Sequence, residues 1–450
     1  MYGPPPDPRQ VLVQLDWSEH GLLIALCVAL GLALSSLFFV KRLPEPARVL
    51  AFVVGQVVTL TSPLALVLDR WVFGAYPTID KAGSLLFYLD GVHQRLAFHP
   101  IDSLSDPAAR LIGVHIGHLW ITQLFDLVLS SFGAMNAQGM LWMVLGWLFA
   151  AMFAREVSTH RDWPTALMLG FPFGMGLHVF RDLNWYTIEK AAVGMLALFA
   201  FALLKALKEG GRWRWLAGAA YALMAWINWY LALVAAFAAA LALLIQWLWG
   251  LKRRERPSWD LALACVASAV CAIPLVVLQL LLLSGEGTLG DPEAFLYERA
   301  MLDSFELWPP RWNRLEVWRA INLPFVALGL YALRRREPLL WGMGVLAGLL
   351  FLLALGPMPF EGVWNPAWMG LRELVPGFWR IAKPEVFFEG SYLLLLALAS
   401  RALDRPLPRW LYPVLVLGWV LAVRMHPVYP GFTEFVELEL SESWMQQVGL

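Results

Sequence analysis

Apolar residues fill this chain in long blocks that short polar segments separate. Each block is roughly 17–25 residues long, the length that an α-helix needs to cross a bilayer at about 1.5 Å per residue. We predict an all-α polytopic membrane protein with about 12 transmembrane helices. The predicted spans lie near residues 21–40, 50–68, 137–154, 164–181, 189–205, 215–230, 232–250, 259–284, 318–333, 338–355, 387–400 and 410–425.

Composition agrees with this pattern. The chain is 59% hydrophobic and 15% charged, whereas soluble domains are about 45–50% apolar and about 25% charged. Its net charge is zero, so nothing indicates a nucleic-acid partner. No phosphate-binding or dinucleotide-binding loop occurs, which leaves a divalent metal as the only cofactor that the sequence keeps open.

Basic residues give the expected orientation. Six short loops that would share one side hold more than half of the 34 Lys and Arg residues. Because such loops mark the cytoplasmic side, we expect both termini to face outward from a bacterial inner membrane. The chain then divides into an outer N-terminal segment, the first two helices, an outer acidic loop, a helical bundle with outer loops 285–317 and 356–386, and an acidic outer tail. These parts are residues 1–20, 21–68, 69–136, 137–425 and 426–450.

The loop 69–136 gathers many of the side chains suited to chemistry. A carboxylate just above the bilayer, beside apolar and aromatic groups, is partly desolvated, which raises its pKa toward that of a general base. We favour Asp80 as this base, and His99 and Asp102 as substrate contacts. The alternative is that these are solvated loop residues, some of which cap turns or helices.

A polar stripe follows in the same loop. His115, His118, Thr122 and Asp126 are spaced by three or four residues, so they share one face of a helix. We predict an amphipathic helix on the outer membrane surface. His115 and His118 are also weak candidates for metal ligands, and an ordinary polar helix surface is the competing interpretation.

Two further polar clusters lie at predicted outer ends of spans. Arg181 and Asp182 either pair structurally or contribute to a headgroup pocket, since charges at that depth are costly unless used or paired. Arg380 and Lys383 precede the span 387–400 and are suited to binding the phosphate of a lipid carrier. Simple snorkelling to lipid headgroups would also explain them.

The order of these parts resembles the GT-C superfamily of integral-membrane glycosyltransferases, in its uncharacterised bacterial branch. The residues that carry the resemblance are Leu355-Gly356-Pro357 and Val375-Pro376-Gly377-Phe378-Trp379-Arg380, continued by Lys383-Pro384-Glu385. The resemblance covers roughly residues 50–425. It implies an inverting sugar transfer from a polyprenyl-phosphate donor to an acceptor. By this resemblance the base is Asp80, with Asp90 and Asp69 behind it, and Arg380 and Lys383 hold the donor phosphate.

The chain also departs from the pattern of that superfamily. It lacks the paired Asp-Glu at the start of the loop, adds the span 21–40, and has only a short acidic tail. These departures favour the main alternative, a non-enzymatic subunit or scaffold of a cell-envelope complex that has a protein partner. A lipid or solute transporter is a third hypothesis, which a polar cavity at the bilayer midplane would favour.

Overall fold

A computed structural model gives the structure of this protein. It describes residues 9–14, 17–65, 116–129, 131–176, 179, 191–253, 259–283, 305–307, 319–321, 323–357, 363–374, 378, 386–403 and 434–439. These residues form thirteen α-helices, two short 3-10 turns and four short strands. The predicted helical class is therefore confirmed, with small strand pairs added to it.

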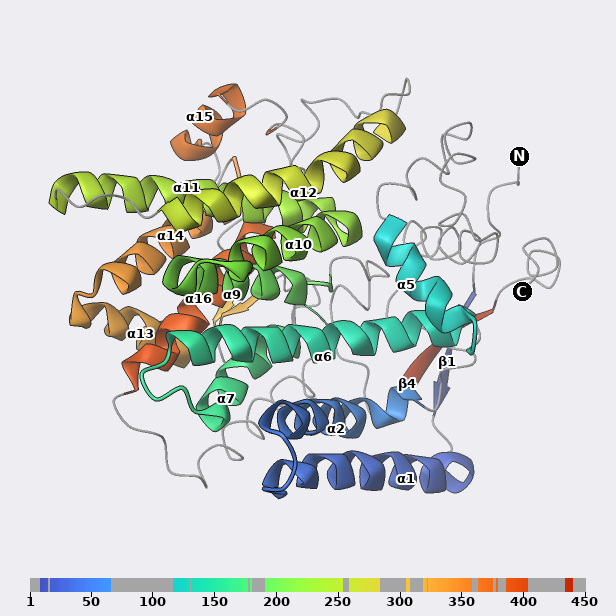
Figure 1. Cartoon of the computed structure of the whole chain (residues 1–450). Helices are drawn as coiled ribbons and strands as arrows, with labels where there is room; N and C mark the ends of the chain where they lie inside the picture. The colour runs from blue at the N-terminus through green and yellow to red at the C-terminus, as the bar shows by residue number, and fades with distance from the viewer. Residues whose placement is uncertain are drawn as a thin grey trace.

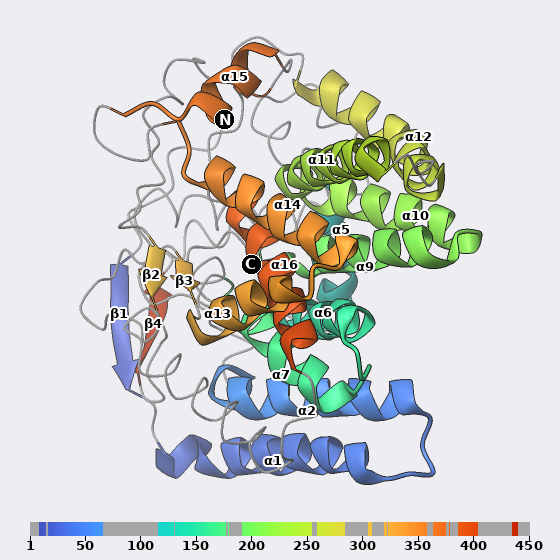
Figure 2. The same cartoon turned by 90° about the vertical axis from the view of Figure 1, so that its left-hand side faces the viewer.

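Most helices lie side by side along one direction (Figure 1). They are α1 (Trp17–Ser36), α2 (Glu45–Ala65), α5 (Ile116–Asp126), α6 (Ser131–Val157), α7 (Trp163–Gly174), α9 (Gly194–Glu209), α10 (Arg212–Ile227), α11 (Trp229–Arg253), α12 (Trp259–Leu283), α13 (Leu323–Ala332), α14 (Pro338–Ala354), α15 (Pro366–Leu374) and α16 (Val386–Ala402). The α1–α2 hairpin forms one edge of the bundle, and α11 and α12 lie toward the opposite edge (Figure 2). The core lies between these edges, around α6, α9 and α16.

Three helices are long and apolar enough to cross a membrane, namely Gly21–Phe39, Gly133–Val157 and Tyr230–Lys252. They indicate a membrane protein. The predicted number of twelve spans is not confirmed. Within the described residues, α7 has 12 residues and α13 has 10, well short of the ~20 that a straight crossing requires, and the predicted span 410–425 lies outside them.

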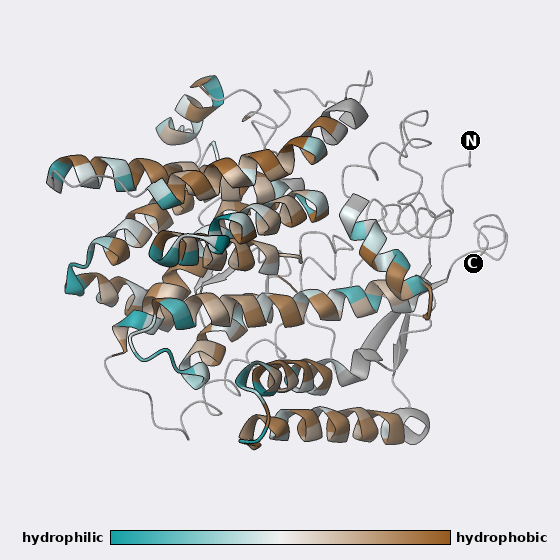
Figure 3. Ribbon diagram, viewed as in Figure 1, coloured by the Kyte–Doolittle hydropathy of each residue, from teal (hydrophilic) through white to brown (hydrophobic). Residues whose placement is uncertain are grey.

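The short basic loops meet at one end of the bundle, where hydrophilic residues gather at the helix ends (Figure 3). Arg155 at the end of α6 pairs with Glu45 at the start of α2 at 3.5 Å. Arg214 of α10 pairs with Asp260 of α12. Arg401 of α16 donates to Glu337, just before α14, at 2.8 Å. Each pair joins two of the loops that the charge pattern assigns to one side, and we call the end of the bundle that carries these pairs the basic end.

Glycines bring the backbones of α6, α7 and α9 into contact. A Cβ on Gly194 would lie 2.6 Å from the backbone nitrogen of Gly146, and one on Gly170 would lie 2.7 Å from that of Ala151. On Gly174, a Cβ would overlap the backbone of Trp147. Only glycine permits such an approach between helices. As a result, α7 ends and α9 begins beside the middle of α6.

The strands form two small pairs. β1 (Arg9–Gln14) pairs antiparallel with β4 (Glu434–Glu439), with Arg9 opposite Glu439. β2 (Phe305–Leu307) pairs parallel with β3 (Arg319–Ile321). The first pair joins the predicted N-terminal segment 1–20 to the predicted acidic tail 426–450, so neither of these two parts stands alone.

Candidate functional site

The predicted catalytic residues, and all the residues predicted to bind substrate, lie outside the described part of the chain. They are Asp69, Asp80, Asp90, His99, Asp102, Arg181, Asp182, Arg380 and Lys383. The structure does not bring them together or separate them, and their roles stay predictions. His115, the first candidate metal ligand, also lies outside; His118, the second, is described.

His118 lies in a buried polar cluster between α5 and α6. The side-chain amide nitrogen of Gln138 lies 2.9 Å from His118 Nδ1 and donates to the His118 backbone oxygen, also at 2.9 Å. Thr122 Oγ1 donates to Gln138 Oε1 at 2.5 Å. His118 is 1% exposed. The described residues hold no group of three His, Cys, Asp or Glu that could bind a metal ion, so the role that the geometry supports for His118 is to fix α5 on α6.

The polar face of this helix is buried, which differs from the ordinary polar surface that its spacing also allowed. A helix does form over Ile116–Asp126, and His118 and Thr122 share a face as predicted. That face is turned inward onto α6, while Leu124 is 61% exposed. The physical reason is that Gln138 of α6 satisfies both side chains, so the polar face is better buried against protein than left at the surface.

Glu389 is a buried acid that the sequence prediction passed over. It is 2% exposed in the first turn of α16, and Tyr392, one turn later, is 1% exposed. Ser400 continues the same helical face and donates to the backbone oxygen of Ala154 in α6 at 2.7 Å. Glu389 thus lies on a helix face that is buried along its length. An ionisable residue inside a membrane bundle is a functional candidate by default. The sequence feature that could have identified Glu389 is a single acidic residue within the apolar run 386–399.

Aromatic rings surround the one described residue of the Pro-Gly-Phe segment. Phe378 is 1% exposed, with its ring 5.1 Å from Phe237 of α11 and 4.8 Å from Trp368 of α15. Phe387 of α16 lies 6.3 Å away. Edge-on aromatic packing of this kind adds to the energy of burial. It anchors the chain two residues before Arg380, the first predicted phosphate contact.

An apolar cavity of about 130 Å³ lies between α9, α11, α14 and α16. One wall is a face of small residues on α11, made of Ala235, Ala238, Ala239 and Ala242. Leucine side chains of α9 and α14 form much of the remaining wall, and every lining residue is apolar. Along α14 the cavity extends from Leu339 near the basic end to Leu350, and on α16 it begins at Gly390. We call this cavity the slot, and its all-apolar lining is suited to an alkyl or isoprenoid chain.

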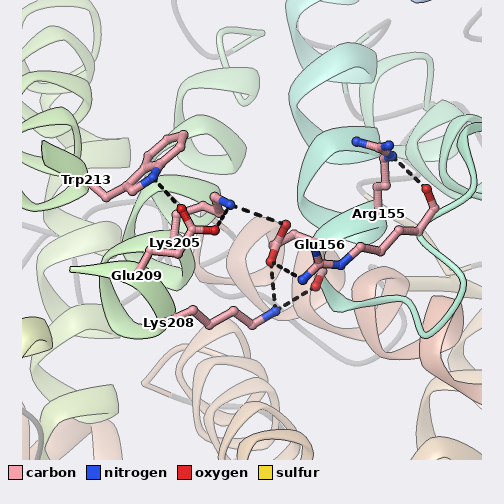
Figure 4. A network of polar contacts seen from close by, with 7 residues as sticks. Arg155, Glu156, Lys205, Lys208, Glu209 and Trp213 are labelled. Carbon is pink, nitrogen blue, oxygen red and sulfur yellow. Dashed lines mark hydrogen bonds and ion pairs between the residues drawn. The ribbon is translucent and has the colours of Figure 1, made fainter. Parts of the chain in front are cut away.

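The basic end carries an ionic network centred on Glu156 (Figure 4). Lys208 Nζ donates to Glu156 Oε1 at 3.0 Å and to the Glu156 backbone oxygen at 2.8 Å. Arg161 and Lys205 approach the same carboxylate at 3.3 and 3.8 Å. Glu156 is 8% exposed, so three cations compensate a largely desolvated charge, as burial requires. The network ties the end of α6 to the end of α9.

Glu209 forms the exposed edge of this network. It pairs with Lys205, and Trp213 Nε1 donates to its carboxylate at 2.8 Å. The hydrogen bond from Lys205 lowers the pKa of the Glu209 carboxyl below its ordinary value of 4.5. Each of these groups has a structural partner, so the network holds the ends of α6, α9 and α10 together.

No family model, curated protein or solved structure matches this chain.

Proposed function

We propose that this protein is a membrane glycosyltransferase of the bacterial inner membrane that moves a sugar from a polyprenyl-phosphate donor to an acceptor on the outer face. The observation that carries this proposal is the apolar cavity. A lipid-linked donor needs a place for its hydrocarbon chain beside the reacting group, and the all-apolar slot between α9, α11, α14 and α16 provides one.

The position of the cavity in the chain supports its connection to the predicted phosphate contacts. Gly390, at one end of the slot, lies in the second turn of α16. Arg380 and Lys383 directly precede that helix in sequence. A chain seated in the cavity would thus begin near the segment that carries the two proposed phosphate-binding residues.

The proposed reaction is a single displacement. The acceptor hydroxyl attacks the anomeric carbon, Asp80 takes the hydroxyl proton, the bond from that carbon to the phosphate oxygen breaks, and polyprenyl phosphate leaves with inversion at the sugar. Positioning and charge stabilisation supply most of the rate enhancement. Asp90 or Asp69 would take the role of Asp80 if the latter is only an acceptor contact.

Filling the cavity tests the proposal. Ala239→Leu adds three carbons to the slot, whereas Ala240→Leu adds them to the next residue, which is exposed. With undecaprenyl phosphate as the probe in native mass spectrometry, we expect A239L to weaken binding by about fiftyfold, since three displaced methylene contacts are worth about 0.8 kcal/mol each. A240L should match the parent protein. Equal binding by both variants would contradict a lipid chain in the cavity.

The activity is tested separately in cells that depend on the gene. Asp80→Asn and Arg380→Ala should abolish the glycan product while the protein stays in the membrane. If both variants, and Asp90→Asn, leave glycan products unchanged, the enzyme is excluded and the non-enzymatic subunit becomes the better hypothesis. The described cavity gives no support to a transporter, because its lining is apolar.

A further inference from the structure

Three segments far apart in sequence meet at one corner of the basic end. Thr159, in the link between α6 and α7, is exposed. Its hydroxyl oxygen accepts a hydrogen bond from Arg401 Nη1 at 3.0 Å and lies 3.5 Å from Arg335 Nη1. Arg401 closes α16 and Arg335 belongs to the link between α13 and α14. Two guanidinium groups thus converge on a single hydroxyl group.

Positive charge dominates this corner. The link between α13 and α14 carries Arg334, Arg335 and Arg336 in succession. Glu337 is the carboxylate that pairs with Arg401, through both of its oxygens at 2.8 Å. Guanidinium groups held close together repel one another, and an anion that both can reach relieves the repulsion. Phosphate suits them, because guanidinium matches its oxygens with paired N–H groups.

The threonine hydroxyl completes this arrangement. A hydroxyl group has one O–H donor as well as two acceptor lone pairs. When a phosphate oxygen replaces the hydroxyl as acceptor for the two guanidinium groups, Thr159 can donate to the same phosphate. The two guanidinium groups point at this hydroxyl, so a phosphate oxygen that takes its place as acceptor lies within reach of all three groups.

The surface next to this corner is suited to lipid. Trp341 and Val345 of α14 are 40% and 44% exposed, and Leu352 continues the same face of the helix. Glu337 lies one turn before Trp341 on that line, so the apolar stripe begins beside the arginine corner. Tyr331 is also exposed, with Arg334 stacked 3.6 Å above its ring. Exposed aromatic residues beside basic residues are typical of the membrane headgroup region.

We propose that Thr159, Arg335 and Arg401 bind the phosphate of an anionic phospholipid, whose acyl chains lie along the exposed stripe of α14. Basic pockets between membrane helices bind anionic lipid headgroups in this way. The bound lipid ties the α6–α7 link to the ends of α13 and α16. The proposal is independent of the transferase activity and uses none of its proposed residues.

Native mass spectrometry of the purified protein with defined lipids tests the site. We expect the parent protein to retain phosphatidylglycerol in preference to phosphatidylcholine. Arg335→Gln should lower the bound phosphatidylglycerol by about tenfold, as expected for the loss of one charge-assisted phosphate contact. Thr159→Val should lower it about threefold, in line with a neutral hydrogen bond.

Arg336→Gln is the matched control. It removes the same charge from the adjacent residue, so any diffuse attraction to anionic lipid falls equally in both variants, and we expect R336Q to lose much less phosphatidylglycerol than R335Q. If R336Q and R335Q behave alike, the attraction is diffuse and the site is refuted. A parent protein without preference for phosphatidylglycerol would refute it as well.

A second arm separates a lipid from free phosphate. Inorganic phosphate is added at increasing concentration to the protein with bound phosphatidylglycerol. We expect it to leave the lipid in place, because it lacks the acyl chains that contact the stripe. If inorganic phosphate displaces the lipid and raises the melting temperature of the parent but not of R335Q, the corner is a soluble-phosphate site and the lipid assignment is wrong.

Discussion

The two halves of the helical bundle are held together in different ways. At the basic end, charged side chains of neighbouring helices pair across loops, as Glu156 does with Lys208 at 3.0 Å. Around Gly174, backbones of α6 and α7 touch directly, and Trp147, whose backbone makes this contact, is fully buried. The basic end therefore depends on charge and tolerates changes of shape, whereas the region around Gly174 depends on the shape of the packed backbones.

Gly174→Ala should have the largest effect, because its Cβ would overlap the backbone of Trp147 and neither helix has room to move. We expect a loss of about 3 kcal/mol in the free energy of unfolding, at the upper end for overpacking of a core. Thermal unfolding in detergent, at low and at high salt, measures it.

Gly348→Ala is its control, since a Cβ there meets nothing within 4 Å. We expect no loss of stability, and a slight gain from the better helix propensity of alanine. An equal loss in both variants, or a loss at Gly174 that changes with salt, would contradict a backbone contact as the cause.

Glu156→Gln comes next. It leaves Lys205, whose side chain is 13% exposed, beside Lys208 and Arg161 without the buried carboxylate. We expect a loss of about 2 kcal/mol, less than for a fully buried pair because Arg161 is largely exposed. In contrast to the glycine variant, this deficit should shrink when added salt screens the repulsion between the cations. If the loss of unfolding free energy in Glu156→Gln does not change with salt concentration, the two halves are not held together in different ways.

Gln138→Leu probes a polar contact in the shape-dependent half. It removes the amide that contacts His118 Nδ1 and accepts from Thr122, and all three residues are buried. The expected loss is about 1–2 kcal/mol, the cost of buried polar groups that lose a partner. Hydrogen exchange should show α5 opening before α6. Unchanged protection of α5 would mean that Gln138 does not hold it in place.

Glu209→Gln should have the smallest effect, because Glu209 is an exposed residue of the basic end. Its folded-state pKa is lowered, so its contribution is present above about 4.5 and is lost as pH falls through the folded value. We expect parent and variant to differ slightly at neutral pH and to converge in acid. Divergence in acid would show that the shift has the opposite sign.

Local pattern predicted much of the fold. Long apolar blocks predicted the helices, and the arginines and lysines between them predicted which helix ends meet. The length of the helix within each apolar block was harder to predict from the sequence. Residues 164–181 look long enough to span, yet α7 ends at Gly174, at a close backbone approach to Trp147 of α6 that apolar character does not predict.

The candidate site was harder to predict from sequence. Periodicity placed His118 and Thr122 on one face of a helix but did not say what that face contacts, because Gln138 belongs to another helix. Glu389 was overlooked inside an apolar run whose average hydropathy outweighs a single acid. In the sequence, the alanines that line the cavity, Ala239 among them, look like those of any apolar helix. The cavity arises only because neighbouring helices pack around them.

The pairing of β1 with β4 imposes an order on assembly. The first strand leaves the ribosome long before its partner exists, so its ladder with β4 forms only after every helix between them has been synthesised. Arg9–Gln14 must therefore wait with an unpaired edge while the bundle inserts. The pairing of β4 with β1 then joins the two ends of the described chain. A chain that stops before Glu434 would leave the hydrogen-bonding edge of β1 unpaired, where the quality-control machinery of the cell can recognise it.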